Sequence, residues 1–385
     1  MNFQIFDYEQ KFDTQLINHF YKSVFHNRDE FEYTRPNSWF QRYSPYNYPI
    51  IKIAKYRDSI VGTLGILPCT AIINGKKLKG GYFVDNCISP DFSEGYDEIM
   101  FELFKSVEKE MINNNLKFIA GWDYLKNFEL HKNLYINSGF SFRRGINWFI
   151  GGLEYKRKKP AKWRGNNKIY WGSAFIILKF YNSFKKFSTP KKIKGVAIKL
   201  SDKTNLIKTI QFLNENHPAK EFHSFYSPEI LEQLWDLVGL RSLIAEKDNK
   251  ILGVATFTIS TWAGLMYGKP FDKEYEEFRT ITLDEFIISK EWINTNLPII
   301  MIRALLDLDK RYQTSSGSSG FVAAIFDRGI EWMQHSFKSV GFLEARADFG
   351  VFLVKPINEF SFNTEAPWSI PARGIIAPYP DWIRE

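Results

Sequence analysis

The sequence predicts an α/β chain (α+β type) that contains two tandem copies of one domain. Three observations predict this organisation: the length of 385 residues, a series of matched segments in the two halves, and one basic segment between them. A chain of this length exceeds one ordinary domain, and a hydrophobic share of 44% is enough for two cores. We expect domains at 1–155 and 196–357, a helical crossover at 156–195, and an extended tail at 358–385.

Each half begins with the pattern of a β-hairpin. In the first half, KYRDSIVGTLGI (55–66) consists of an apolar run, a turn at Arg57-Asp58 and a second apolar run. In the second half, EKDNKILGVATFTI (246–259) repeats this pattern. The second apolar run of each segment contains a glycine, Gly62 or Gly253. Two apolar runs joined by polar turn residues are typical of a hairpin.

An apolar strand with an acidic residue follows each hairpin. The segments YFVDNCISPDF (82–92) and ITLDEFIISKEW (281–292) align Asp85 with Asp284. Each segment leads into an amphipathic helix, YDEIMFELFKSVEKEM in the first half and LPIIMIRALLDLDKRY in the second.

A short apolar strand and a helix close each half. The strands LKFIAGWD and GFVAAIFD end in Asp123 and Asp327, which we interpret as turn or helix-cap residues. The helices FELHKNLYINSGF and IEWMQHSFKSVGF end at Gly139 and Gly341, which suit a left-handed helix stop. Five matches in the same order favour an internal duplication over two unrelated α/β domains.

The order of these elements resembles the GNAT (Gcn5-related N-acetyltransferase) superfamily. The resemblance covers most of 30–155 and, more weakly, 200–357. The first half also carries residues of the family's Asn…Tyr-x-x-x-Gly-Phe pattern, at Asn127, Tyr135, Gly139 and Phe140. The resemblance implies two tandem GNAT-like domains, each a mixed, largely antiparallel twisted sheet flanked by helices. It also implies acyl transfer from a thioester to an amine or hydroxyl.

Tyr135 is the general acid that the resemblance implies, because a phenol can protonate the sulfur anion that leaves a thioester. The alternative is an amphipathic tyrosine packed at a helix end. His131 lies four residues earlier and would share a helix face with Tyr135, although a surface histidine is the simpler interpretation. The matching position in the second half is Phe337, which has no proton to donate.

Carboxylates on the acidic strands are candidate bases. Asp85 in the first half, and Asp284 with Glu285 in the second, lie on the strands that border the donor cleft in GNAT folds. A carboxylate there can take the proton of an incoming amine, directly or through water. The alternative is an acid that faces the surface, because strands point every second residue outward.

The family's glycine-rich pyrophosphate loop is absent from both copies. In the first half the loop runs through Ser93 and Gly95, where Tyr96 obstructs close approach and Glu98 repels phosphate. The second loop contains Asn294, Thr295 and Asn296, carries no acid, and suits the start of a helix. These five loop residues, Ser93, Gly95, Asn294, Thr295 and Asn296, are the candidates for donor binding.

The altered loops leave four interpretations open. The donor is an acyl-carrier protein, or it is coenzyme A held by an unusual loop. A third interpretation is aminoacyl-tRNA, as in the Fem-type ligases, which resemble tandem GNAT folds. The fourth is a binding module without catalysis. We favour an N-acyltransferase that moves a fatty-acyl or similarly bulky group to an acceptor such as a peptide or a sugar.

The positive charge of the chain belongs to one segment. Residues 156–199 contain 14 Lys or Arg and no acid, which leaves 37 basic against 43 acidic residues elsewhere. We expect this segment to dock an acidic carrier protein, phosphates of coenzyme A or tRNA, or an anionic membrane surface. The two cysteines, Cys69 and Cys87, fit neither a disulfide framework nor a metal site. Together with an N-terminus that lacks a secretory pattern, they lead us to expect a cytoplasmic protein without a metal.

Overall fold

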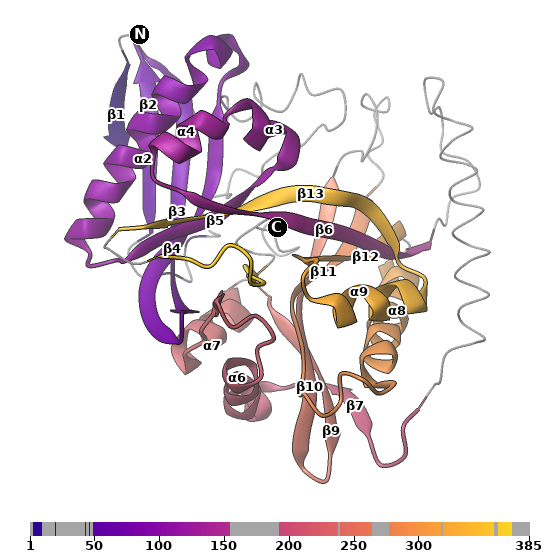
Figure 1. Ribbon diagram of the computed structural model, residues 1–385. Helices are drawn as coiled ribbons and strands as arrows, with labels where there is room; N and C mark the ends of the chain where they lie inside the picture. The colour runs from indigo at the N-terminus through magenta and orange to yellow at the C-terminus, as the bar shows by residue number, and fades with distance from the viewer. Residues whose placement is uncertain are drawn as a thin grey trace, which may run out of the picture.

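The two halves of the chain lie one above the other and share one sheet (Figure 1). The computed structural model describes residues 3–9, 20, 43, 46, 49–154, 192–237, 239–263, 277–316, 319–357 and 361–371. Most of the predicted basic crossover, at 156–191, lies outside the described residues.

The N-terminal half places its helices on one face of its strands (Figure 1). Its elements are β1 (Gln4–Asp7), β2 (Ile50–Tyr56), β3 (Ser59–Ile73), β4 (Lys76–Ile88), the 3-10 helix η2 (Pro90–Gly95), α2 (Tyr96–Asn113), β5 (Phe118–Tyr124), α3 (Leu125–Leu130), α4 (Lys132–Asn137) and β6 (Ser141–Glu154). Helix α2 forms because its apolar side chains recur at helical spacing from Ile99 to Met111, and these residues are buried against the sheet.

The C-terminal half repeats this order with additional helices. Its elements are β7 (Ala197–Leu200), the 3-10 helix η3 (Lys203–Asn205), α6 (Leu206–Glu215), β8 (Phe222–Ser224), α7 (Pro228–Leu237), β9 (Arg241–Lys247), β10 (Lys250–Ala263), β11 (Glu277–Ile288), α8 (Leu297–Ser316), β12 (Ser319–Asp327), α9 (Glu331–Val340) and β13 (Leu343–Pro356). None of the helices within the described ranges combines the length and the apolar character that crossing a membrane requires.

The last strand of each half is exchanged with the other half. Within the described residues the strand order is β1-β2-β3-β4-β5-β13-β6-β12-β11-β10-β9-β7, and β8 pairs with β3. Strand β13 therefore pairs with β5 of the N-terminal half, and β6 pairs with β12 of the C-terminal half. Figure 1 shows the yellow β13 and the purple β6 crossing between the halves side by side.

Several local predictions are confirmed by the backbone. The hairpins β2–β3 and β9–β10 form as expected, with positive φ at Arg57, Asp248 and Asn249 in their turns. Gly139 and Gly341 follow the ends of α4 and α9 with φ of +82° and +97°. Both glycines adopt the left-handed conformation that the sequence predicts for a helix stop.

Strands β4 and β11 occupy equivalent places and separate from their parallel neighbours at equivalent points. The pairing of β4 with β5 ends at Tyr82, and that of β11 with β12 ends at Thr282. Beyond these points each strand continues to Ile88 or Ile288. Two central parallel strands therefore diverge at an equivalent point in both halves.

A β-bulge follows each point of divergence and corrects the alignment of the acids. Gly62 pairs with Ile88, and Gly253 pairs with Ile288, so these two positions correspond. Counting back from them places Asp85 level with Glu285, whereas the sequence pattern aligned it with Asp284. Both strands contain six residue steps from the last parallel pair to the residue opposite the glycine, so strand pairing sets the correspondence that the apolar pattern alone left one residue off.

The predicted helix at 128–140 is wrong in one respect, because it breaks into α3 and α4 at His131. His131 has φ of −110° and ψ of 20°, which lie outside helical values. Its imidazole contacts a residue of α2 instead of continuing the helix face toward Tyr135.

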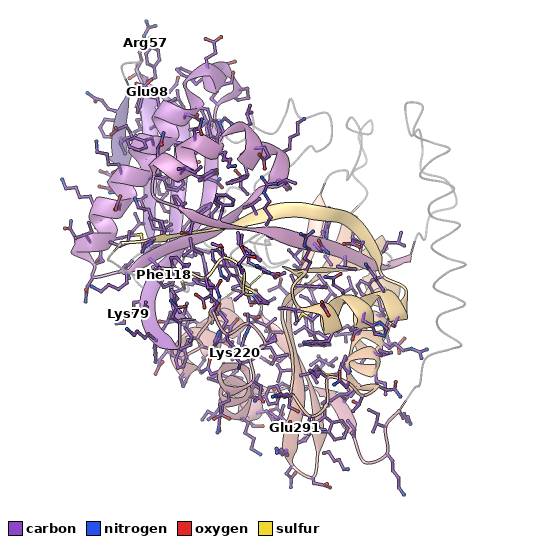
Figure 2. The ribbon with its side chains drawn as sticks, in the orientation of Figure 1. Arg57, Lys79, Glu98, Phe118, Lys220 and Glu291 are labelled. Atoms are coloured by element: carbon purple, nitrogen blue, oxygen red, sulfur yellow. The ribbon has the colours of Figure 1, made fainter. Side chains whose placement is uncertain are left out.

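A shared core joins the two halves. Phe118 of β5 packs edge-on against Phe222 of β8, with ring centroids 5.6 Å apart. In Figure 2, Phe118 lies at the lower end of the N-terminal half, toward Lys220 of the C-terminal half. Two further cores lie under α2 and under α8 with α9, and the exchanged strands contribute Val351 and Leu353 to the first and Phe149 to the second.

Candidate functional site

A buried carboxylate lies at the bulge of β11. The Glu285 side chain is 3% exposed and accepts two hydrogen bonds. The Tyr226 hydroxyl donates to Oε1 at 3.0 Å, and the His217 imidazole lies 3.2 Å from Oε2 through Nε2. Asp284, the neighbouring candidate, is the extra residue of the bulge and is also buried.

The hydrogen bonds around His217 fix its tautomer. The backbone N–H of Ala219 donates to Nδ1 at 3.2 Å, so Nδ1 is the unprotonated nitrogen. Nε2 therefore carries the proton and donates it to Glu285. This arrangement holds the carboxylate in one orientation with two neutral donors.

A second histidine is stacked on the first. The rings of His217 and His223 lie 4.4 Å apart at an angle of 11°. Burial, and then the nearby His217 and Lys220, lower the pKa of His223 to about 3, so it is neutral at physiological pH.

The segment that carries these residues lies between the halves. Strand β8 pairs with β3 of the N-terminal half, and Ser224 Oγ lies 2.6 Å from the hydroxyl of Tyr82 on β4. The opposite side of the segment reaches Glu285 of the C-terminal half. The carboxylate is thus held by a segment that both halves position.

The N-terminal half contains a related centre at its own bulge. Asp85 has a positive φ of 57° and is 7% exposed. The Tyr43 hydroxyl donates to its Oδ2 at 2.6 Å, and the Thr63 hydroxyl donates to its backbone carbonyl at 2.7 Å. Each half therefore presents a buried acid that a tyrosine hydroxyl holds.

Tyr135 is fully buried and bound to a different acid. Its hydroxyl donates to Oδ2 of Asp123 at 2.6 Å, and its exposed fraction is 0%. Asp123 also accepts hydrogen bonds from Asn127 Nδ2 at 2.7 Å and from the backbone N–H of Tyr124 at 2.8 Å. The predicted helix-cap role of Asp123 is wrong, because Tyr124 is the N-cap of α3 and no side chain caps it. The Asp123 carboxylate instead binds the phenol proton of Tyr135.

Burial shifts the titration of both groups. It raises the pKa of Asp123 to about 6, although the hydrogen bonds from Tyr135 and Asn127 oppose this shift. Burial, and then the Asp123 carboxylate, raise the pKa of Tyr135 well above its usual value. The phenol therefore holds its proton tightly, which disfavours its ionisation at neutral pH.

His131 forms its own contacts near the surface. Its Nδ1 lies 2.6 Å from Oδ1 of Asp97, and its ring stacks on Tyr96 with centroids 3.9 Å apart. These contacts lie over the first turn of α2. The predicted pairing of His131 with Tyr135 on one helix face does not form, because the helix breaks at His131 itself.

The two donor turns differ in charge and in capping. In the first turn, Ser93 is exposed, Gly95 is buried, and Asp97 and Glu98 stand in the first turn of α2. Two acids at a helix N-terminus counteract the positive end of the helix dipole, so this turn is poorly suited to bind a further anion.

The second donor turn carries no acid after Glu291. Asn294, Thr295 and Asn296 are exposed, and the Thr295 hydroxyl accepts a hydrogen bond from the N–H of Leu297 at 3.1 Å. Of the two turns, this one is suited to an anionic donor group.

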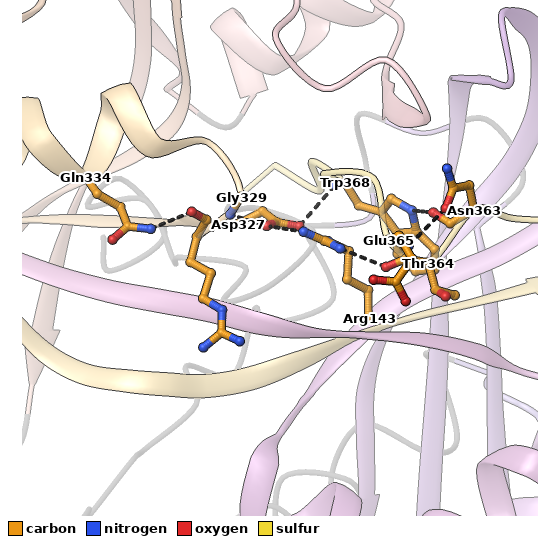
Figure 3. Close-up of polar contacts among 9 residues, drawn as sticks. Arg143, Asp327, Gly329, Gln334, Asn363, Thr364, Glu365 and Trp368 are labelled. Atoms are coloured by element: carbon orange, nitrogen blue, oxygen red, sulfur yellow. Dashed lines mark hydrogen bonds and ion pairs between the residues drawn. The ribbon is translucent and has the colours of Figure 1, made fainter.

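Asp327 corresponds to Asp123 but has a role at the junction (Figure 3). Arg143 of the exchanged strand β6 donates two hydrogen bonds to its carboxylate, one of them at 2.9 Å. The backbone N–H groups of Gly329 and Trp368 also donate to it, at 2.7 and 3.1 Å. The predicted turn role is confirmed by Gly329, and the other contacts tie the tail segment to both halves.

Sequence analysis identified Glu285 but not the residues that hold it. His217, His223 and Tyr226 lie about 60 residues before Glu285, and none of them belongs to a family motif. Their density within NHPAKEFHSFY is the one signal that marks the segment. Among the described residues, no group of three or more His, Cys, Asp or Glu side chains is arranged to hold a metal ion.

Solved structures with the same layout cover nearly the whole chain. Saccharomyces cerevisiae N-myristoyltransferase with bound myristoyl-CoA matches 92% of this chain and 82% of its own, with a TM-score of 0.58 and 11% identity. A tandem GNAT protein from the clavulanic acid biosynthesis pathway matches 94% of this chain and 100% of its own, with a TM-score of 0.57 and 10% identity. The fold is a tandem GNAT fold.

A third solved structure also matches this chain, whereas comparison of sequences gives no match. A GCN5-related N-acetyltransferase from Anabaena variabilis also matches, over 93% of this chain and 73% of its own, with a TM-score of 0.52 and 10% identity. No protein-family model and no curated protein sequence matches this chain. Identities this low establish the fold and leave the reaction to be argued from the residues.

Proposed function

We propose that this chain is an acyltransferase that moves an acyl group from a thioester donor to an amine or hydroxyl acceptor. The observation that carries the proposal is the buried Glu285 carboxylate, held by His217 and Tyr226 at the bulge where β11 leaves β12. A fixed carboxylate at the divergence of the central strands suits a general base. The similarity to N-acyltransferases supports the same reaction class.

In the proposed reaction the acceptor attacks the thioester carbonyl. The acceptor's nitrogen or oxygen forms a bond to the carbonyl carbon, Glu285 takes its proton, and the carbon–sulfur bond breaks. The proton then passes to the leaving thiolate, which departs as a free thiol. The two neutral donors on Glu285 orient the carboxylate before and after it takes the proton.

The proposal places donor binding in the C-terminal half. The turn at Asn294–Asn296 leads into α8 without an acidic side chain, so it suits the phosphates of coenzyme A. An acyl-carrier protein presents the same pantetheine thioester and is the second donor of this class. S. cerevisiae N-myristoyltransferase binds myristoyl-CoA, which supports a fatty-acyl thioester as the first donor to test.

The test is thiol release from acetyl-, octanoyl- and myristoyl-CoA and from acyl-carrier protein, in the presence and absence of amines. Glu285→Gln keeps the shape of the side chain and removes its basicity. We expect kcat to fall by about 100-fold or more, as removal of a general base usually does. Asp85→Asn, the matched change in the other half, shows which half contains the active site. If Asp85→Asn abolishes turnover and Glu285→Gln does not, the site lies in the N-terminal half instead.

A further inference from the structure

Four buried polar atoms of the C-terminal half have no hydrogen-bond partner among the described residues. They belong to Thr209, His223, Ser242 and Thr256. Ser242 and Thr256 are 1% and 0% exposed, and His223 is 5% exposed. A buried polar group without a partner loses its hydrogen bonds to water and forms none within the protein, so it requires a specific explanation.

Two of these residues form a row with Glu285 across three strands. Thr256 of β10 lies directly opposite Glu285 of β11 on one side and Ser242 of β9 on the other. Side chains at directly opposite positions point to the same face of a sheet, with Cβ atoms about 5 Å apart. The two free hydroxyls therefore extend in a line from the proposed base.

The same face lies in the core between the halves. Val254 and Ile287, which flank the row on β10 and β11, belong to the core cluster that both halves share. Helix α6, which carries Thr209, packs on β10. His223 joins this group through its ring contact with His217, which donates to Glu285.

The unpartnered nitrogen of His223 is Nδ1. In a neutral imidazole one nitrogen donates a hydrogen bond and the other accepts one, depending on the tautomer. A hydroxyl group can both donate and accept, so it suits Nδ1 in either tautomer, whereas a thioester carbonyl can only accept.

We propose that Ser242, Thr256 and His223 form the acceptor subsite, and that the acceptor carries hydroxyl groups beside its reacting amine or hydroxyl. This inference rests on the proposed function and names the substrate class of the same site. The two hydroxyls bind hydroxyl groups of the acceptor, and Nδ1 of His223 forms a further hydrogen bond with it. The row carries no positive side chain and Glu285 adds a carboxylate, so anionic acceptors are repelled.

A matched pair of small amines tests the subsite. Serinol (2-amino-1,3-propanediol) has two hydroxyl groups, and isopropylamine has the same branched skeleton without them. We expect serinol, and not isopropylamine, to give a saturation-transfer NMR signal that depends on the row. The double variant Ser242→Ala/Thr256→Val loses the serinol signal, whereas Thr63→Val, which removes a hydroxyl beside Asp85 in the other half, keeps it. An equal serinol signal in the wild type and the double variant would overturn the proposal, as would its absence from the wild type.

Protein stability separates a ligand subsite from a structural role. Thr63 donates to the carbonyl of Asp85, so Thr63→Val should lower the melting temperature. The hydroxyls of Ser242 and Thr256 make no such bond, so the double variant should melt at the wild-type temperature or above it. If the double variant melts as low as Thr63→Val, the hydroxyls serve the fold, and the subsite is refuted.

Turnover distinguishes failure of the subsite from failure of the proposed reaction. With an active donor, we expect the double variant to lower kcat/KM for serinol by about tenfold and to leave that for isopropylamine unchanged, since two uncharged hydrogen bonds are lost. An unchanged value for serinol contradicts the subsite alone. Absence of thiol release with every donor contradicts the acyltransferase, and serinol binding then stands as a separate result.

Discussion

Arg143 of β6 and Asp327 of β12 form an ion pair with two hydrogen bonds where the exchanged strand enters the C-terminal half. The Asp327 side chain is fully buried, and that of Arg143 is 12% exposed. Arg143 also donates to the carbonyl of Thr364 in the tail at 2.7 Å. One guanidinium thus connects both halves and the tail.

Arg143→Ala should destabilise the protein strongly. The change leaves the Asp327 carboxylate buried without its cation, which typically costs about 3–5 kcal/mol of unfolding free energy. Urea unfolding at pH 7 measures the loss. Arg144→Ala is the matched control, because Arg144 pairs with Glu129 at a site where both side chains are about half exposed. That pair should contribute about 1 kcal/mol or less. Equal losses for the two variants would contradict the role of Arg143.

Trp368→Ala should show how far the tail stabilises the junction. Trp368 is fully buried in the shared core and packs near Phe222. Removing so large a buried side chain typically costs about 3–5 kcal/mol. Leu130→Ala is the control, since Leu130 is 75% exposed and its truncation should change stability by about 0.5 kcal/mol or less. If Trp368→Ala costs as little stability as Leu130→Ala, the tail does not stabilise the junction.

Asp123 should make stability fall as the pH rises from about 4 to 6. Burial raises its pKa from 3.8 to about 6, so between these values the folded state binds more protons than the unfolded state. Protonation therefore favours folding, and this contribution is complete below pH 4 and lost above pH 6. The shift corresponds to about 3 kcal/mol. Urea unfolding between pH 4 and 7 should show a steeper decline for the wild type than for Asp123→Asn. Parallel curves would contradict the shift.

Tyr135→Phe distinguishes a reaction centred on Tyr135 in the N-terminal half from one centred on Glu285 in the C-terminal half. If Tyr135 is the acid that the GNAT resemblance implies, the variant loses kcat. In the structure its proton is bound to Asp123, so we expect kcat to change by about twofold or less. We also expect stability at pH 7 to fall by about 1–3 kcal/mol, because a buried carboxylate loses a donor. A large fall in kcat at unchanged stability would return the chemistry to the N-terminal half.

Local patterns predicted the elements well because each has a local cause. Alternating and helical spacing identified both hairpins and helices α2 and α8. Gly139 and Gly341 marked helix ends because a left-handed conformation favours glycine. The break at His131 has no such signal, because it arises from contacts with Tyr96 and Asp97, more than 30 residues away.

The candidate site was predicted in part. The sequence identified Glu285 as an acid on a central strand, but not the residues that hold it. His217 and Tyr226 reach it through a segment whose position depends on the pairing of β8 with β3. The exchange of β6 and β13 was also missed, because it depends on which strands pair, and the sequence pattern of a strand does not specify its partner. Periodicity specifies a strand's faces and leaves its partner open.

Because the last strands are exchanged, the N-terminal half cannot complete its sheet until the C-terminal half has been synthesised. The sheet of the N-terminal half lacks its neighbour for β5 until residues 343–356 leave the ribosome, long after β5 itself has been synthesised. Until then β5 presents an unpaired edge, which is prone to bind other chains. A fragment that stops at residue 155 would lack β13 and keep this edge unpaired. We therefore expect the N-terminal half to fold only as part of the same polypeptide as the C-terminal half.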